Sequence, residues 1–213
     1  MKHSIALATA ALLISPLAQA NGNWYIGLDL MNTEADTNGW VEGIEDIGGI
    51  PVENEGGGLS LLAGYQYTPW IALEVGLSRQ AIEVIDYEKS SGLFYYEYLM
   101  VDAYVNTLSV GTKMRYLTNS GFGFYAKPSI AYTMTEVDIN GNSTSGGDKL
   151  DENEKNSTVH FNFEVGAEYF LSDSFSLGLA YERQFDALDY SIKALDSDKI
   201  STNSYKLGIR YYF

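Results

Sequence analysis

Hydrophobic and polar residues alternate with a period of two along eight stretches of the chain. Such alternation is typical of β-strands, because successive side chains of a strand point to opposite faces of the sheet. We interpret the following stretches as strands: residues 24–32, 58–67, 70–80, 103–116, 122–135, 158–170, 174–184 and 203–213. The pattern therefore predicts an all-β protein with eight strands.

The connections between these stretches are alternately short and long. The short ones contain turn-forming residues and cover Thr68-Pro69, 117–121 and 171–173. The long ones lie near 33–57, 81–102, 136–157 and 185–202. Short turns at one end and long loops at the other are typical of bacterial transmembrane barrels, and an even strand count places both termini at the periplasmic end. We therefore predict an eight-stranded antiparallel up-and-down transmembrane β-barrel.

The two faces of the predicted strands differ in polarity. One face is apolar and has no charged residue, as in Leu73, Val75 and Leu77. The other face is small or polar. A Lys or Arg that faces lipid at mid-depth costs about 2–4 kcal/mol, so we expect the apolar face to contact lipid and the polar face to line the lumen. A soluble barrel has the reverse arrangement.

Aromatic residues at the strand ends fit the girdles that flank a bilayer. We expect Trp24, Tyr67, Trp70, Tyr116 and Phe213 at the periplasmic rim. Pro128 lies inside the fifth predicted strand, where it removes a ladder hydrogen bond. We expect a local bulge or irregular pairing at that position.

The first twenty residues have the features of a secretory signal peptide. A short polar start precedes the apolar run 4–14, and Ala18-Gln19-Ala20 matches the small-x-small cleavage pattern. We therefore predict a signal peptide at 1–20 and one outer-membrane β-barrel domain at 21–213. The chain has no cysteine, which excludes disulfides and thiolate metal sites, and we predict no metal site and no cofactor.

Charged residues on the lumen face are balanced in sign. Buried charges are tolerated when they are paired and hydrogen-bonded, so ten such residues predict a packed salt-bridge network inside the barrel. They are Asp29, Glu74, Glu164, Glu168 and Glu182, with Lys113, Arg115, Lys127, Lys206 and Arg210. A narrow water or ion path and a catalytic role for the carboxylates are the alternatives.

The formal net charge of −15 must therefore arise mainly in the loops. The segment 33–57 contains seven acidic residues and no Lys or Arg. These acids either keep the loops solvated, bridge to anionic lipopolysaccharide through divalent cations, or contact a cationic partner. Nucleic-acid binding requires a basic face, so we expect no nucleic-acid partner.

Arg79 and Arg183 extend the outward row just beyond its apolar part, at similar distances from a periplasmic turn. Arg binds phosphate with two parallel hydrogen bonds. We therefore expect both residues to contact lipopolysaccharide phosphates at the outer leaflet; simple snorkelling of their long side chains is the alternative.

These features together resemble the OmpA-like family of small outer-membrane barrels. The matching pieces include Trp24-Tyr25-Ile26-Gly27, Leu73-Glu74-Val75-Gly76 and Gly111-Thr112-Lys113, and the resemblance covers 24–213. It implies a location in the outer membrane of a Gram-negative cell. The peptidoglycan-binding domain that follows the barrel in OmpA itself is not expected here.

The last predicted strand carries the most specific part of the resemblance. It is similar to the signal that the outer-membrane barrel assembly machinery recognises, with an aromatic residue at its end. Independently of the resemblance, an amphipathic edge strand can pair with another strand edge during assembly. The residues of this expected assembly signal are Tyr205, Leu207, Ile209, Tyr211 and Phe213.

Three functions fit these features. The first is a non-enzymatic, monomeric barrel that supports membrane integrity or surface interaction through its acidic loops. The second is a small pore. The third is a lipid-modifying barrel enzyme, for which His160 is the only histidine after the signal peptide and has no serine or aspartate in convincing register. We predict no catalytic residue.

Overall fold

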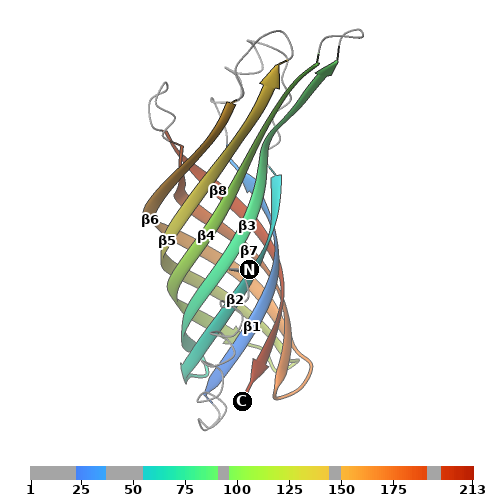
Figure 1. Ribbon diagram of the computed structural model, residues 1–213. Helices are drawn as coiled ribbons and strands as arrows, with labels where there is room; N and C mark the ends of the chain where they lie inside the picture. The colour runs from blue at the N-terminus through green and yellow to red at the C-terminus, as the bar shows by residue number, and fades with distance from the viewer. Residues whose placement is uncertain (1–22, 37–54, 91–95, 144–149, 191–197) are drawn as a thin grey trace.

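The computed structural model describes residues 23–36, 55–90, 96–143, 150–190 and 198–213 (Figure 1). The predicted signal peptide at 1–20 lies outside the described residues, as does most of the acidic segment 33–57. Among the described residues there is no helix long and apolar enough to span a membrane.

Eight antiparallel strands form a closed barrel in which each strand pairs with its neighbours in sequence and β1 pairs with β8. This confirms the predicted fold. The strands are β1 (Trp24–Ala35), β2 (Glu55–Thr68), β3 (Ile71–Ser90), β4 (Tyr96–Leu117), β5 (Phe122–Ser143), β6 (Leu150–Phe170), β7 (Phe175–Tyr190) and β8 (Asp198–Tyr212).

The short connections lie at one end of the barrel, where β8 also ends (Figure 1). Thr68 closes the turn between β2 and β3 by accepting hydrogen bonds from the backbone N–H groups of Trp70 and Ile71 through its hydroxyl oxygen. Gly121 adopts a φ of 83° in the turn between β4 and β5, a conformation that favours glycine. The turn-forming residues predicted from the sequence therefore form the turns.

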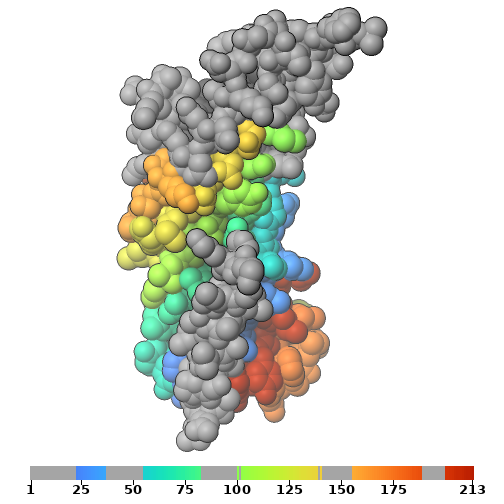
Figure 2. Space-filling model, viewed as in Figure 1, coloured from blue at the N-terminus to red at the C-terminus, as the bar shows by residue number. Residues whose placement is uncertain are grey.

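Several strands are longer than the sequence predicted. Most of the segments 81–102, 136–157 and 185–202, which were predicted as long loops, lie in strands β3 to β8. The prediction of loops there was wrong, because alternation in polarity marks a strand only where its two faces meet different surroundings. Hydrogen bonding to the neighbouring strand continues beyond that zone. Strands β3 to β6 consequently rise above β7 and β8 on the other side (Figure 1), and the face that β3 to β5 form is seen in Figure 2.

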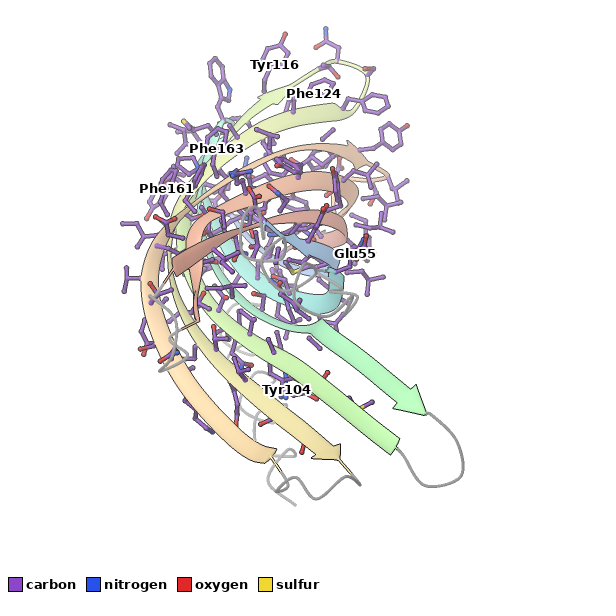
Figure 3. The ribbon with its side chains drawn as sticks, turned by 90° about the horizontal axis from the view of Figure 1, so that it is seen from above. Glu55, Tyr104, Tyr116, Phe124, Phe161 and Phe163 are labelled. Carbon is purple, nitrogen blue, oxygen red and sulfur yellow. The ribbon has the colours of Figure 1, made fainter. Side chains whose placement is uncertain are left out.

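The outward row of side chains is exposed and apolar. Leu30, Leu77, Ile130 and Leu179 are 57–65% exposed, although each lies in the middle of a strand. Tyr116 and Phe124 face each other on β4 and β5 and point away from the barrel (Figure 3). An apolar belt of this kind is the surface that a barrel presents to lipid.

The ladder is irregular in several places, including register shifts between Gln66 and Thr68 in β2 and between Glu83 and Ile85 in β3. Between β4 and β5, the pairs that would join Thr112 to Pro128 and Lys113 to Lys127 are missing, while the register on both sides stays the same. The expected irregular pairing at Pro128 is thus confirmed, and a bulge there is not. A bulge occurs instead in β7, between Gln184 and Leu188, where Asp186 adopts a φ of 55°.

Candidate functional site in the barrel lumen

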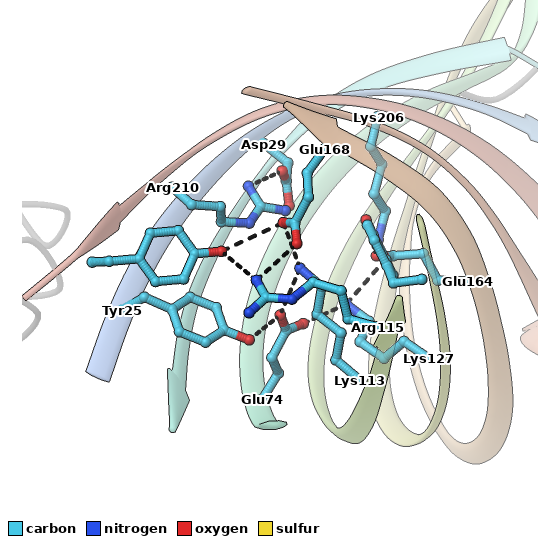
Figure 4. Close-up of polar contacts among 12 residues, drawn as sticks. Tyr25, Asp29, Glu74, Lys113, Arg115, Lys127, Glu164, Glu168, Lys206 and Arg210 are labelled. Atoms are coloured by element: carbon cyan, nitrogen blue, oxygen red, sulfur yellow. Dashed lines mark hydrogen bonds and ion pairs between the residues drawn. The ribbon is translucent and has the colours of Figure 1, made fainter. Parts of the chain in front are cut away.

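Eight of the ten charged residues predicted in the lumen form a continuous chain of ion pairs in which acids and bases alternate (Figure 4). Neighbouring members are joined at 2.8–3.1 Å, except for one contact of 3.8 Å. We call these eight residues the ionic chain; in order they are Arg115, Glu168, Lys113, Glu74, Lys127, Glu164, Lys206 and Glu182.

The other two charged residues predicted in the lumen form a separate pair. Arg210 on β8 donates to Asp29 on β1 at 2.6 Å, and both side chains are buried. All ten residues that the sequence assigned to the lumen therefore lie there, and each has an oppositely charged partner. Alternation of sign leaves none of these buried charges uncompensated, which is the condition under which buried ions are tolerated.

Three tyrosines that the sequence analysis left out of the network also belong to it. The hydroxyl of Tyr212 accepts from Arg115 at 3.2 Å and donates to Glu168 at 3.4 Å. Tyr25 lies flat over Gly64, its cross-strand partner, and donates its hydroxyl to Glu74 at 2.6 Å. A Cβ atom at position 64 would collide with the Tyr25 ring, so only glycine leaves room for this arrangement. The same three residue types recur elsewhere in the lumen, with a hydroxyl-to-carboxylate distance of 2.9 Å: Tyr125, Gly166 and Glu164.

A layer of hydroxyl and amide side chains follows the ionic chain toward the loop end of the barrel. Thr33 and Ser204 are hydrogen-bonded at 2.7 Å. Thr107, Thr133 and the Nε2 atom of His160 form a chain of two 2.8 Å hydrogen bonds. His160 thus points into the lumen as expected, but its hydrogen bond is to a threonine, and no carboxylate bonds its Nδ1 atom among the described residues. This geometry lacks the oriented base of a catalytic triad.

One step further toward the loops, the inward side chains become apolar. We call this group the apolar cap; its members are buried and come from six strands: Ala35, Ile82, Ala103, Val105, Val137, Ala187, Leu188 and Ile200. Ile82 keeps the inward phase of Gln80, and Ile200 that of Thr202. The continued alternation at Ile82 and Ile200 was the signal that sequence reasoning missed, because the segments 81–102 and 185–202 were assigned to loops. Leu188 keeps the inward phase of Gln184 as well, whereas Ala187 was beyond prediction, since the β7 bulge turns it inward against that phase.

The lumen has almost no free space. Its cavity in the polar part measures about 20 Å³ and is lined by Glu74, Lys127, Asn162 and Lys206, among others. One water molecule requires about 10–15 Å³, so this space fits one or two waters. In the described part of the chain, no group of His, Asp and Glu side chains is arranged to hold a metal ion.

The two arginines predicted to contact lipopolysaccharide both lie on the outer face above the apolar belt, but their surroundings differ. Arg183 donates to Asp36 at 3.0 Å and to the side-chain oxygen of Asn203 at 3.2 Å. Arg79 lies against the ring of Tyr104 at 5.8 Å. The structure therefore separates two residues that the sequence treated alike.

The residues of the expected assembly signal alternate as the sequence indicated. Tyr205, Leu207, Ile209 and Tyr211 are exposed on the outer face of β8, and Phe213 packs edge-on against Tyr211 with ring centroids 5.0 Å apart. In the closed barrel β8 is paired on both sides, with β7 and β1. Recognition by the assembly machinery stays a prediction.

Comparison with known proteins agrees with this geometry. The profile of the family described as "Outer membrane protein beta-barrel domain" matches residues 4–213. The chain belongs to this family. It is a barrel of the outer membrane, and the resemblance inferred from the sequence is confirmed at the level of small outer-membrane barrels. No protein of curated function matches the chain.

Solved structures with the same fold are distant in sequence. Neisserial surface protein A is 13% identical with a TM-score of 0.58, over 89% of this chain and 97% of the other. OprG from Pseudomonas aeruginosa is 15% identical with a TM-score of 0.55, over 90% and 96%. Ail, the attachment invasion locus protein of Yersinia pestis, is 12% identical with a TM-score of 0.53, over 91% and 100%. At these identities the likeness shows the fold.

Proposed function

We propose that this protein is a closed, non-conducting and non-enzymatic barrel that supports the outer membrane and interacts with the surroundings through its extracellular surface. The observation that carries the proposal is the filled lumen, with its ionic chain and Asp29–Arg210 pair below and its apolar cap above. A hydrated ion cannot pass a dry apolar layer without losing its water shell, which is costly. The small-pore function is therefore disfavoured.

Planar-bilayer conductance of the refolded protein tests this proposal. We expect no steady openings, while a porin of known conductance inserted in the same bilayers gives stepwise currents. Heat-modifiable migration on a gel verifies that the inserted protein is folded. Steady openings that disappear when the protein is unfolded by heat would overturn the proposal.

The non-enzymatic part of the proposal rests on the surroundings of His160, whose hydrogen bond is to Thr133. Cells that express the wild-type chain or its His160→Ala variant are expected to have lipid A of the same mass as cells without the protein. Mass spectrometry of extracted lipid A measures this. A mass change with the wild-type chain that is lost in the variant would contradict it.

The surface role is supported by the acidity of the chain. The net charge is −15, and the segment 33–57 has seven acids without a base. Ail has been crystallised with the polyanionic heparin analogue sucrose octasulfate. A surface of the opposite sign favours cationic partners or divalent cations instead. We therefore expect the protein in detergent to bind a polycation column but not a heparin column. Replacement of Glu42, Glu45 and Asp46 by neutral residues is expected to weaken binding to the polycation column.

A further inference from the structure

We propose that Arg79 and the apolar groove beside it bind one lipid A molecule of the outer leaflet through its phosphate, and that Arg183 does not. The inference goes beyond the function proposed above and is independent of whether the lumen conducts. It rests on the difference between the two arginines, on the groove and on the position of both relative to the apolar belt.

Arg183 already forms an ion pair with the carboxylate of Asp36. Its Nη2 atom lies 3.0 Å from the Asp36 carboxylate, and its Nη1 atom donates to Asn203. The hydroxyl of Tyr181 donates to the same Asn203 oxygen at 2.7 Å, which holds that amide in place. The guanidinium charge is thereby neutralised, and two of its donors are occupied. A phosphate at this position would meet the Asp36 charge as well.

Arg79 has no such partner. Among the described residues, no ion pair or hydrogen bond joins its guanidinium to another side chain, and Tyr104 covers one face of it. A ring on the face of a guanidinium leaves the N–H groups at its edge available. These groups form the fork that matches two phosphate oxygens. A cation at the edge of a hydrocarbon layer is stabilised by an anion, and the outer leaflet supplies phosphate.

The strand register places apolar residues directly below this cation. Arg79 pairs with Leu59 on one side and Asn106 on the other. The next outward row toward the periplasmic end consists of Leu61, Leu77 and Leu108. A phosphate-binding group therefore lies on the loop side of an apolar strip, in the order that headgroup and acyl chain have in a lipid.

The outer surface is hollowed at the same place. A groove of about 370 Å³ is lined by Arg79, Asn106 and the leucines of β1 to β4, together with Met134 of β5. A second groove of about 590 Å³ lies over β6, β7, β8 and β1, and Tyr181 and Tyr205 are among the residues that line it. The second groove is larger, but the arginine nearest to it along β7, Arg183, is the one paired with Asp36. Charge complementarity therefore assigns the lipid to the first groove.

The two arginines provide a matched pair of variants, Arg79→Gln and Arg183→Gln. We expect native mass spectrometry of the detergent-purified protein, titrated with lipid A, to show binding about tenfold weaker for R79Q, equivalent to about 1.4 kcal/mol. R183Q is expected to bind as the wild type does. R79K, which keeps the charge but not the fork, is expected to lie between them.

Ligand variants test the wild-type protein without relying on any substitution. Dephosphorylated lipid A is expected to bind about tenfold more weakly than lipid A, and phosphatidylglycerol more weakly than lipid A because it fills less of the groove. Equal losses in R79Q and R183Q, unchanged binding in R79Q, or equal binding of the dephosphorylated lipid would overturn the proposal. Tighter binding of phosphatidylglycerol would overturn the assignment to lipid A. Heat-modifiable migration confirms that each variant is folded.

Discussion

The ionic chain and the apolar cap fill successive parts of one lumen, and they do so by different physics. In the ionic chain, every base contacts at least one acid at 2.8–2.9 Å, so each side chain depends on a few particular partners. The eight residues of the apolar cap contact one another without direction. Because its contacts are directional, the stability of the ionic chain depends on the charge and the hydrogen-bonding groups of each side chain. The stability of the apolar cap depends instead on the volume of its side chains.

The difference explains why the barrel needs both layers. An ionic chain alone would still attract water and ions to its surface. The apolar cap keeps water from reaching the ionic chain from the loop end, and the hydroxyls of Thr33, Thr107 and Thr133 between the two layers bond within their own layer. The following substitutions test this division, beginning with the largest expected effect.

Glu164→Gln removes an acid that joins two lysines of the ionic chain. Glu164 is 1% exposed and contacts both Lys127 at 3.1 Å and Lys206 at 2.8 Å. Because two buried ammonium groups lose their shared partner, we expect the free energy of unfolding to fall by about 4 kcal/mol. Urea titration in lipid vesicles, followed by tryptophan fluorescence, measures this value.

Lys155→Gln is the control for that experiment. Lys155 contacts Glu136 at 2.7 Å, a distance like those in the lumen, but the two side chains are 69% and 38% exposed. A solvent-exposed ion pair contributes about 0–1 kcal/mol, so the free energy of unfolding from the same titration should barely change. A loss of the same size in both variants would show that burial is not what gives the ionic chain its importance.

Leu188→Ala empties part of the apolar cap. Leu188 is 1% exposed and pairs with Ile200, so we expect a loss of about 3 kcal/mol from the cavity and the lost burial. The exposed Leu171→Ala, in the turn after β6, should change the stability by about 0.5 kcal/mol or less. Since the ionic chain below is intact, L188A is expected to remain non-conducting in planar bilayers. Steady openings of L188A would show that the apolar cap alone blocks the passage of ions.

Gly64→Ala shows how far the ionic chain also depends on packing. The added methyl group would collide with the Tyr25 ring and displace its hydroxyl from Glu74. Overpacking of this kind costs about 2 kcal/mol. Gly57 lies on the same strand and faces outward, where a Cβ atom meets almost nothing, so Gly57→Ala should leave the stability unchanged. Equal losses of stability in the two variants would mean that the loss comes from replacing glycine in a strand and not from the collision with Tyr25.

The sequence by itself determined the architecture and the sorting of residues between lipid and lumen. Alternation of Leu73, Val75 and Leu77 with Glu74 and Gly76 fixes which side chains can face hydrocarbon, because a charge there is excluded by its desolvation cost. The turn residues at Thr68 and Gly121 fix where the strands reverse. Both the sorting of side chains and the positions of the turns depend on residues that are close in sequence, so the period of two and the turn residues are enough to predict them.

Only the tertiary structure decided which charges meet. Arg183 is neutralised by Asp36, 147 residues away in sequence, while Arg79 is not, and no local pattern distinguishes the two. The β7 bulge likewise turns Ala187 into the lumen against the phase of its strand. Pairing of this kind depends on the register between strands and on the closure of β1 against β8, and both arise only when the whole barrel forms.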